Sequence, residues 1–150
     1  MAFVFRPSTQ SNNTKQVTMN RTVFERYVKS FCEDLAQKNH DFSHRHRHAC
    51  VITYNDAVLS SAVNVTLQND FTRVYNDLKG LHAEALAIMR ALHRHSNVLH
   101  KSELWVCRTN GTRLSRPCPM CMNIIKTFRI PVIHYTDYNG VWNIEQIDFG

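Results

Sequence analysis

The chain has 150 residues, of which 43% are hydrophobic, so it is long enough and apolar enough to form one folded domain. No apolar run reaches the ~18–20 residues that a membrane-spanning helix needs, and we see no signal-peptide pattern, so we expect a soluble, cytoplasmic protein. The formal net charge of +6 favours anionic partners such as nucleotides or nucleic acid, without choosing between them.

A polar arm and one helix are predicted for the first part of the chain. Residues 1–20 are rich in Asn, Ser, Thr and Gln and lack acidic side chains, which is typical of a flexible arm. Apolar residues recur every three or four positions in residues 22–37, which predicts an amphipathic helix with Asn20 or Thr22 as its cap. Because residues 21–150 show no repeat and no linker, we expect them to form a single domain.

A β-hairpin is predicted next. Residues 49–54 and 57–65 are rich in Val, Ile and small residues, and Asn55-Asp56 separates them as a turn. The run of alternating His and Arg at residues 44–48 precedes the first strand. We favour a solvated entry to the strand for this run, and a contact with phosphate or nucleic acid is the alternative.

Helices and strands follow each other in the second half of the chain. Apolar spacing and turn signals predict a helix over residues 81–93, a strand over 104–107, a helix that starts at Pro117 and covers 118–128, and strands over 131–135 and 141–147. Asn139-Gly140 is a strong turn signal, so the last two strands are predicted to form an antiparallel hairpin.

Two short motifs contain the side chains most suited to chemistry. His82 and Glu84 lie at the start of one predicted helix, and Cys118 and Cys121 lie at the start of the next. One imidazole and two thiolates can hold a single Zn²⁺ ion and leave its fourth position open for water. A Glu two residues after the His can move protons to and from that water without binding the metal. This H-x-E and P-C-x-x-C combination is the signature of zinc-dependent nucleobase deaminases.

The cysteine count agrees with a metal site rather than with a disulfide framework. The total of five is odd, and two of the five form the C-x-x-C motif. We interpret Cys32, Cys50 and Cys107 as small core residues, because they lie in apolar segments. A structural zinc knuckle is the alternative use of the motif, but such a site usually takes a fourth protein ligand.

These motifs resemble those of the cytidine deaminase-like superfamily, which includes cytidine, deoxycytidylate, tRNA adenosine and polynucleotide cytosine deaminases. The stretches LHAEALAI and RPCPMCMNII, at residues 81–88 and 116–125, are similar to its two metal-binding segments. The resemblance implies an α/β fold of three layers, with a central five-stranded mixed sheet and helices on both faces. It also implies one Zn²⁺ per chain, held by His82, Cys118 and Cys121, with Glu84 as the catalytic proton shuttle.

The resemblance also suggests substrate contacts. Asn64 corresponds to a family Asn that contacts the sugar, and the Ala83 amide and the Pro117 carbonyl would face the base. Ser115 and Arg116 precede the two cysteine ligands in a long, polar loop, where Arg116, together with Arg108 and Arg113, could meet a phosphate. Ordinary solubility of the loop is an equally good explanation of these arginines.

The sequence therefore predicts a zinc-dependent hydrolase that deaminates cytosine to uracil in a nucleoside or nucleotide. The alternative is an editing deaminase that acts on cytosine in single-stranded DNA or RNA, or on adenine in RNA, with tryptophans as possible stacking platforms. Packing within strands is the explanation we favour for Trp105 and Trp142. Assembly into homo-oligomers is possible, and a non-enzymatic zinc-stabilised binding domain is the least favoured alternative.

Overall fold

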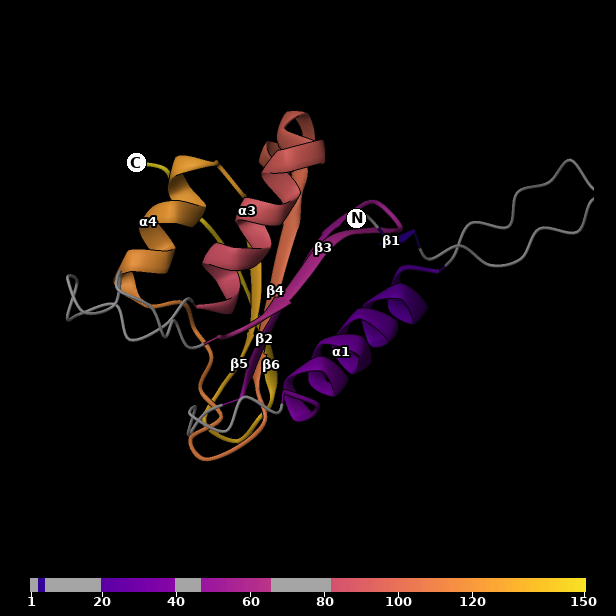
Figure 1. Cartoon of the computed structure of the whole chain (residues 1–150), viewed down its shortest axis with the longest axis vertical. Coiled ribbons are helices and arrows are strands. Elements are labelled where there is room, and N and C mark those ends of the chain that lie inside the picture. Colours follow the sequence, from indigo (N-terminus) through magenta and orange to yellow (C-terminus); the bar gives the residue numbers. More distant parts are fainter. Residues whose placement is uncertain (1–2, 5–19, 40–46, 66–81) are drawn as a thin grey trace, which may run out of the picture.

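The computed structural model describes residues 3–4, 20–39, 47–65 and 82–150, which form a mixed sheet with helices packed on both faces (Figure 1). The sheet order is β1-β3-β2-β4-β5-β6. The strands are β1 (Phe3–Val4), β2 (His48–Tyr54), β3 (Ala57–Val63), β4 (Glu103–Arg108), β5 (Val132–Thr136) and β6 (Trp142–Gln146).

The strand directions confirm the predicted mixed sheet. β4 and β5 are parallel, whereas the other neighbouring pairs are antiparallel, including the predicted final hairpin of β5 and β6. All five predicted strands are present. The two-residue strand β1 adds a sixth at the edge, beside β3, which the sequence did not predict because short strands depend on pairing with distant residues.

The helices are α1 (Arg21–Gln37), α3 (Ala83–His95), α4 (Pro119–Thr127) and the 3₁₀ helix η1 (Ser96–Lys101). α1 lies on one face of the sheet, and α3 and α4 lie on the other (Figure 1). Within the described residues, no helix is long and apolar enough to cross a membrane. In the parallel β4-α4-β5 unit, α4 runs antiparallel to the two strands. It therefore starts near the carboxyl end of β4.

Each face of the sheet has its own apolar core. On the α3/α4 side, Cys50 and Ile52 from β2 pack with Leu104 and Val106 from β4. On the α1 side, neighbouring residues of the same strands, Trp105 among them, pack against the helix. This alternation follows from the pleat, which points successive side chains to opposite faces.

The predictions that three cysteines and two tryptophans pack in the core are confirmed. The thiols that the sequence assigned to the core, Cys32, Cys50 and Cys107, are all free and buried. Trp105 is fully buried and Trp142 is partly buried against the α1 side, so both pack within the strands as predicted.

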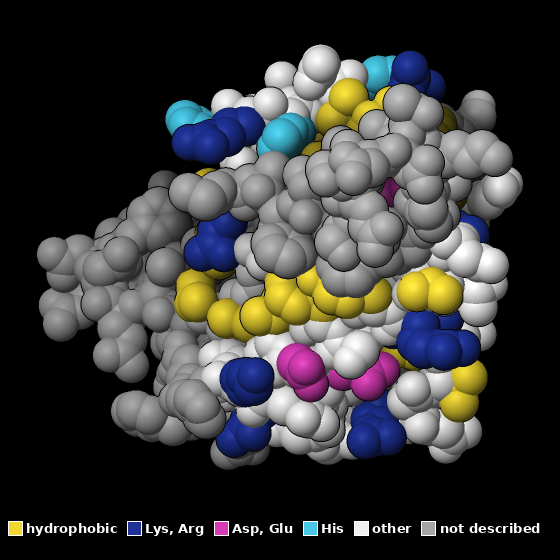
Figure 2. All heavy atoms as spheres, turned by 90° about the vertical axis from the view of Figure 1, so that its right-hand side faces the viewer, with side chains coloured by type: hydrophobic (Ala, Val, Ile, Leu, Met, Phe, Trp, Pro, Cys, Tyr) yellow, Lys and Arg dark blue, Asp and Glu magenta, His cyan; other side chains and the backbone are white. Residues whose placement is uncertain are grey.

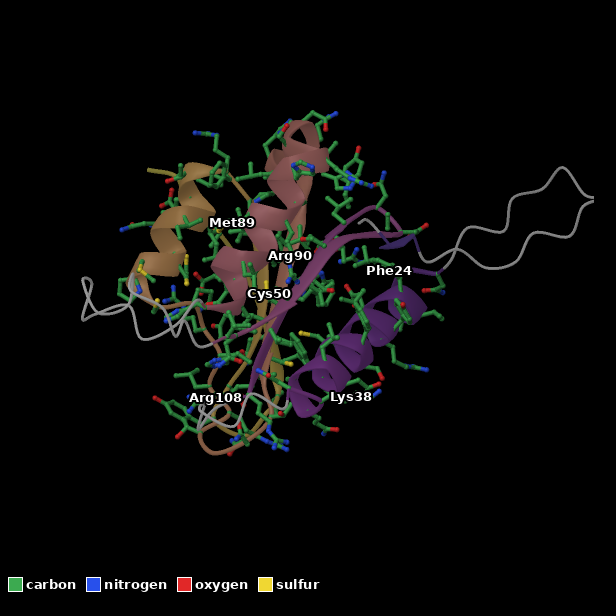
Figure 3. The ribbon with its side chains drawn as sticks, in the orientation of Figure 1. Phe24, Lys38, Cys50, Met89, Arg90 and Arg108 are labelled. Carbon is green, nitrogen blue, oxygen red and sulfur yellow. The ribbon has the colours of Figure 1, made fainter. Side chains whose placement is uncertain are left out.

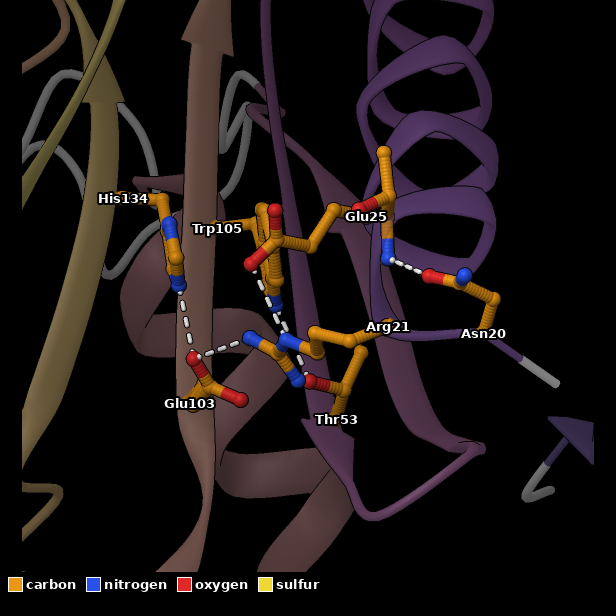
Figure 4. A network of polar contacts seen from close by, with 8 residues as sticks. Asn20, Arg21, Glu25, Thr53, Glu103, Trp105 and His134 are labelled. Atoms are coloured by element: carbon orange, nitrogen blue, oxygen red, sulfur yellow. Dashed lines mark hydrogen bonds and ion pairs between the residues drawn. The ribbon is translucent and has the colours of Figure 1, made fainter. Parts of the chain in front are cut away.

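A polar network joins the start of α1 to the amino end of β4 (Figure 4). The Glu103 carboxylate accepts hydrogen bonds from Arg21 and from His134 Nε2, each at 2.8 Å. The His134 ring stacks on Trp105, with centroids 3.5 Å apart, and the Trp105 indole N–H donates to the Thr53 hydroxyl. Burial alone would raise the pKa of Glu103, but the hydrogen bonds from His134 and Arg21 outweigh it, so its pKa lies below its ordinary value.

Basic side chains gather on the surface where α3 ends and η1 follows, at the top of Figure 2. His93, Arg94, His100 and Lys101 are all exposed there. The sequence from residue 85 to residue 102 contains no acidic residue, so α3 after Glu84 and the whole of η1 contain no negative side chain. This end of the molecule is therefore positively charged.

Candidate metal and catalytic site

Three potential metal ligands meet at the first residues of two helices. His82 is the N-cap residue of α3, Cys118 is the N-cap residue of α4, and Cys121 lies in the first turn of α4. His82 Nδ1 is 3.3 Å from the Cys121 sulfur and 3.6 Å from the Cys118 sulfur. All three ligand atoms lie within 4.8 Å of one another, so one ion can contact them together.

The local sequence explains why the helices start at these positions. Pro119 favours the first helical position after Cys118, because its ring fixes φ and its missing N–H would have no partner there. Neither His82 nor Cys118 uses its side chain to cap its helix, so both remain available as ligands. The dipole of α4 also stabilises negative charge in its first turn, which favours the thiolate forms of Cys118 and Cys121.

The donor set fits zinc. Two sulfurs and one imidazole nitrogen suit a tetrahedral Zn²⁺ ion, and three protein ligands leave one position for a water molecule. Among the described residues, no fourth His, Cys, Asp or Glu joins this group. Among the residues that the structure describes, the three ligands therefore form one zinc site whose fourth position no protein side chain fills, which is the open type rather than a closed structural knuckle.

Glu84 lies beside the ligands and is buried, with 6% of its surface exposed. Burial raises the pKa of its carboxyl group, and the nearby His82 and a hydrogen bond with Cys121 offset only part of that effect. Burial and the adjacent Glu84 likewise raise the pKa of the Cys121 thiol. Metal binding releases the thiol proton. A bound divalent cation would therefore offset the raised pKa of Cys121 and stabilise its thiolate as a ligand.

Cys50, in β2, lies in the core close to Glu84 and Cys121. The sequence predicted a core position for Cys50 but not its closeness to the site. Its thiol is fully buried, and burial together with the charges of Glu84 and Cys121 raises its pKa. The alternation of the strand predicts that Cys50 and Ile52 share a face. Which helix covers that face depends on strand pairing, so the sequence offered no direct signal.

Asn64, the predicted sugar contact, is held by neighbours in the structure. Its side-chain oxygen accepts hydrogen bonds from the Asn39 amide at 2.8 Å and from the backbone N–H of His48 at 2.9 Å. It follows β3 directly and is buried. Ala83 and Pro117, the predicted contacts to the base, are also buried and adjoin His82 and Cys118 in the chain.

The two loop residues predicted as substrate contacts interact within the protein. The Ser115 hydroxyl is buried and lies 2.8 Å from both the Val106 carbonyl oxygen and the Thr136 hydroxyl. Arg116 forms a two-pronged ion pair with Glu145 of β6, at 2.9 and 3.1 Å. Of the run at residues 44–48, only Arg47 and His48 lie within the described residues; Arg47 donates to the Gln37 carbonyl, and His48 begins β2.

Comparisons with solved structures agree with this architecture. A cytidine deaminase from Burkholderia pseudomallei aligns with a TM-score of 0.61 at 15% identity, covering 85% of this chain and 93% of that one. A dCMP deaminase from the cyanophage S-TIM5, in complex with dCMP and dUMP, aligns with a TM-score of 0.57 at 20% identity, covering 79% and 84%. At these identities the likeness establishes the fold alone.

The comparison of family models identifies the family. No curated protein matches the chain. The model of the cytidine and deoxycytidylate deaminase zinc-binding region matches residues 23–136, a stretch that contains all three ligands and Glu84. With that match, the open zinc site and the three-layer fold, the chain belongs to the cytidine and deoxycytidylate deaminase zinc-binding family.

Proposed function

We propose that this protein hydrolytically deaminates cytosine to uracil in a nucleoside or nucleotide. The observation that supports this best is the burial of Glu84 beside a set of three ligands that leaves one metal position open. A purely structural zinc site has no use for a buried carboxylate that is not a ligand. Such a carboxylate is, however, what acid–base chemistry on a bound base requires.

The proposed role of Glu84 is to move the two protons of the attacking water, one to the ring and one to the leaving amino group. Bound Zn²⁺ would lower the pKa of a coordinated water molecule and so supply the nucleophile. Glu84 accepts a proton from the water and delivers it to the N3 nitrogen of the ring, as the C4–O bond forms. It then takes the second proton from the new C4 hydroxyl and passes it to the amino group, the C4–N bond breaks as the C4 carbonyl forms, and the products are uracil and ammonia.

Backbone groups at the helix starts would orient the base. Ala83 is the first residue of α3, so its N–H has no acceptor within the helix and is suited to a base oxygen. The Pro117 carbonyl, directly before the ligand Cys118, would accept from the amino group of the base. Asn64 would contact the sugar, and its bonds to Asn39 and His48 hold it in one orientation.

The test is a product assay with the zinc-loaded chain. Cytidine, deoxycytidine and their 5′-monophosphates are incubated with the protein, and uracil products are separated by chromatography. We expect conversion of at least one substrate and none with Glu84→Gln, which keeps the size of the side chain but cannot take up a proton. Failure of all four substrates with the zinc site filled would refute the proposal.

Editing of a single-stranded nucleic acid is the second candidate function. The basic surface around Arg94 and Lys101 favours it, because phosphate contacts supply most of the affinity of such complexes. The same assay with single-stranded DNA and RNA containing one cytosine, and with RNA containing a target adenine, distinguishes the two. Steep loss of binding as salt rises, together with product in the strand and none from the monomers, would favour editing.

A further inference from the structure

β6 forms one edge of the sheet, and its outer side is open. It pairs with β5 in an antiparallel register, and no other described strand lies beside it. The strand contains no proline, no lysine and no shift of register, which are features that protect an exposed edge from pairing. At the opposite edge, the two-residue strand β1 is too short to act as a template for another strand. β6 is therefore the long, unprotected edge of the sheet.

Hydrogen bonds at both ends of β6 establish which of its backbone groups face outward. The Val141 carbonyl accepts from the residue that follows β5, at 2.9 Å, and the Ile147 N–H donates to the residue that precedes β5, at 2.8 Å. Alternate residues of a strand direct their N–H and C=O groups to opposite sides, so those of Trp142, Ile144 and Gln146 point away from β5. Within the part of the chain that the structure describes, these outward groups have no hydrogen-bond partner.

The Ile144 side chain is exposed beside this open edge, with 64% of its surface accessible. Trp142 lies on the same face two residues earlier and packs against α1, where its indole N–H donates to Glu33 at 2.7 Å. α1 covers the middle of the sheet, with Phe24 between the helix and the strands (Figure 3), and it leaves Ile144 uncovered. Burial of this aliphatic side chain against a partner would be favourable.

The backbone of β6 is complementary to a second copy of itself. When two β6 strands pair antiparallel about a two-fold axis at Ile144, Ile144 faces Ile144 of the partner subunit, and Trp142 faces the partner's Gln146. These are the pairs that exchange two hydrogen bonds, so every outward group of both strands gains a partner. A shift of the register by two residues leaves Trp142 or Gln146 unpaired, so the register centred on Ile144 is the most favourable.

The side chains on the other face of this pairing cause no electrostatic conflict. In the same register Asn143 lies opposite the partner's Glu145, so an amide faces a carboxylate and no like charges are directly opposed. Each Glu145 is also neutralised by Arg116 of its own chain, at 2.9 Å. This match of backbone and charge favours a second copy of the chain, rather than an unrelated strand, as the occupant of the edge.

We propose that two copies of this chain associate through their β6 strands, antiparallel and centred on Ile144, so that the two sheets continue into one. The inference goes beyond the proposed deaminase function and does not depend on it. A contact of 5 residues from each chain is smaller than a standard interface. We therefore expect a reversible dimer with a dissociation constant of about 1–100 µM.

Sedimentation velocity of the zinc-loaded full chain, from about 1 µM to about 500 µM, tests the proposal. We expect the average mass of wild type to double over this range. Ile144→Lys and Ile144→Glu each oppose like charges across the axis and should raise the dissociation constant at least about tenfold. Val23→Lys, which changes an exposed aliphatic residue of α1, is the matched control and should associate like wild type. Zinc content and thermal melting confirm that each variant is folded.

Mixing the two charged variants tests the register itself. Because residue 144 faces its own counterpart, an equimolar mixture of Ile144→Lys and Ile144→Glu brings opposite charges together and should form dimers that neither variant forms alone. A loss of folding would not be repaired by mixing. If both variants are folded monomers and the mixture also stays monomeric, the strands do not pair about Ile144 and the proposal fails.

Hydrogen exchange of single amides tests the backbone pairing. Protection of the Trp142, Ile144 and Gln146 amides should rise with protein concentration, whereas the Asn143 and Glu145 amides, which face β5, should be protected at every concentration. An association that leaves the three outward amides unprotected would overturn the proposal, because the contact would then lie on another surface.

The oligomeric state gives the remaining contrary outcomes. A wild type that stays monomeric at about 500 µM would refute the proposal. If wild type forms a larger assembly, the two Ile144 variants should halve its mass, and an unchanged mass would refute the role of β6. Binding of an extended peptide of unrelated sequence to the β6 edge of a monomeric wild type would also refute it, because the occupant would then be a different chain.

Discussion

Glu84, in α3, and Glu103, at the start of β4, lie on opposite faces of one sheet. Their surroundings shift their pKa values in opposite directions. Glu103 has two cationic or protonatable partners, Arg21 and His134, and its pKa is lowered despite burial. Glu84 has no arginine or lysine partner among the described residues, and burial raises its pKa. The difference shows that the charge of Glu103 is paired within the fold whereas that of Glu84 is not, as expected of the group proposed above to exchange protons.

The starts of the helices show the same contrast. Asn20 caps α1 in the ordinary way, because its side-chain oxygen accepts from the Thr22 amide at 2.8 Å. His82 and Cys118 occupy the equivalent positions of α3 and α4 and make no such bond. α3 and α4 therefore each lack a side-chain cap, which usually stabilises a helix by about 1 kcal/mol. Metal ligands occupy the two cap positions instead.

The largest expected effect is on activity, from exchanging each carboxylate for an amide. Glu84→Gln should lower kcat by about 10²–10⁴-fold or more, because the proton shuttle is lost, while zinc content stays at one per chain. Glu103→Gln removes a carboxylate of the same size and should leave kcat within about threefold, since Glu103 lies at the far end of β4. Steady-state rates and metal analysis check both, and equal losses in the two variants would contradict the contrast.

Cys118→Ser should separate metal binding from helix capping. We expect zinc content to fall close to zero, because a hydroxyl is a poor replacement for a thiolate. In chelator, however, the free energy of unfolding should exceed that of Cys118→Ala by about 1 kcal/mol, because Ser caps a helix and Ala does not. Urea denaturation with and without chelator measures both effects. Equal stability of the two metal-free variants would mean that the helix start gains nothing from a cap.

Glu103→Gln should lower the free energy of unfolding of the zinc-loaded protein by about 2 kcal/mol at neutral pH, because it weakens two charge-assisted hydrogen bonds. The effect has a defined pH dependence. Since the pKa of Glu103 is lower in the folded chain than its ordinary value of 4.5, its contribution is complete above about pH 5.5 and disappears as pH falls through the folded pKa.

Urea titrations of wild type and Glu103→Gln from about pH 3 to pH 7 measure that dependence. The difference in stability between the two should be constant at the upper end of this range and should shrink below about pH 4.5. A difference that grows as the pH falls would show that the ionised carboxylate is not the stabilising form.

The three metal ligands were predictable because they lie in two short motifs with recognisable spacings. His82 and Glu84, and likewise Cys118 and Cys121, are close in the chain, so one helix turn fixes each pair. The final hairpin was predictable for the same reason, because Asn139-Gly140 is a local turn signal. Features that depend only on local spacing can be read before any tertiary contact is known.

Features that depend on distant pairing could not be predicted. Arg116 was expected to be available for substrate, but its partner Glu145 lies 29 residues away. The network partners Arg21 and Glu103 are 82 residues apart. In each case the face or the partner is set by sheet topology, which no single-sequence pattern contains.

The smallest expected effect comes from the helix start that has no part in the chemistry. Asn20→Ala should lower the free energy of unfolding by about 1 kcal/mol, because the Thr22 amide loses its acceptor. Asn20→Asp, which keeps an acceptor and adds a charge that suits the helix dipole, should cost less. Both variants should keep full zinc content and unchanged kcat. If Asn20→Ala lowered kcat as well as stability, the start of α1 would influence the metal site. The surroundings of Glu103 and those of Glu84 would then not be independent of each other.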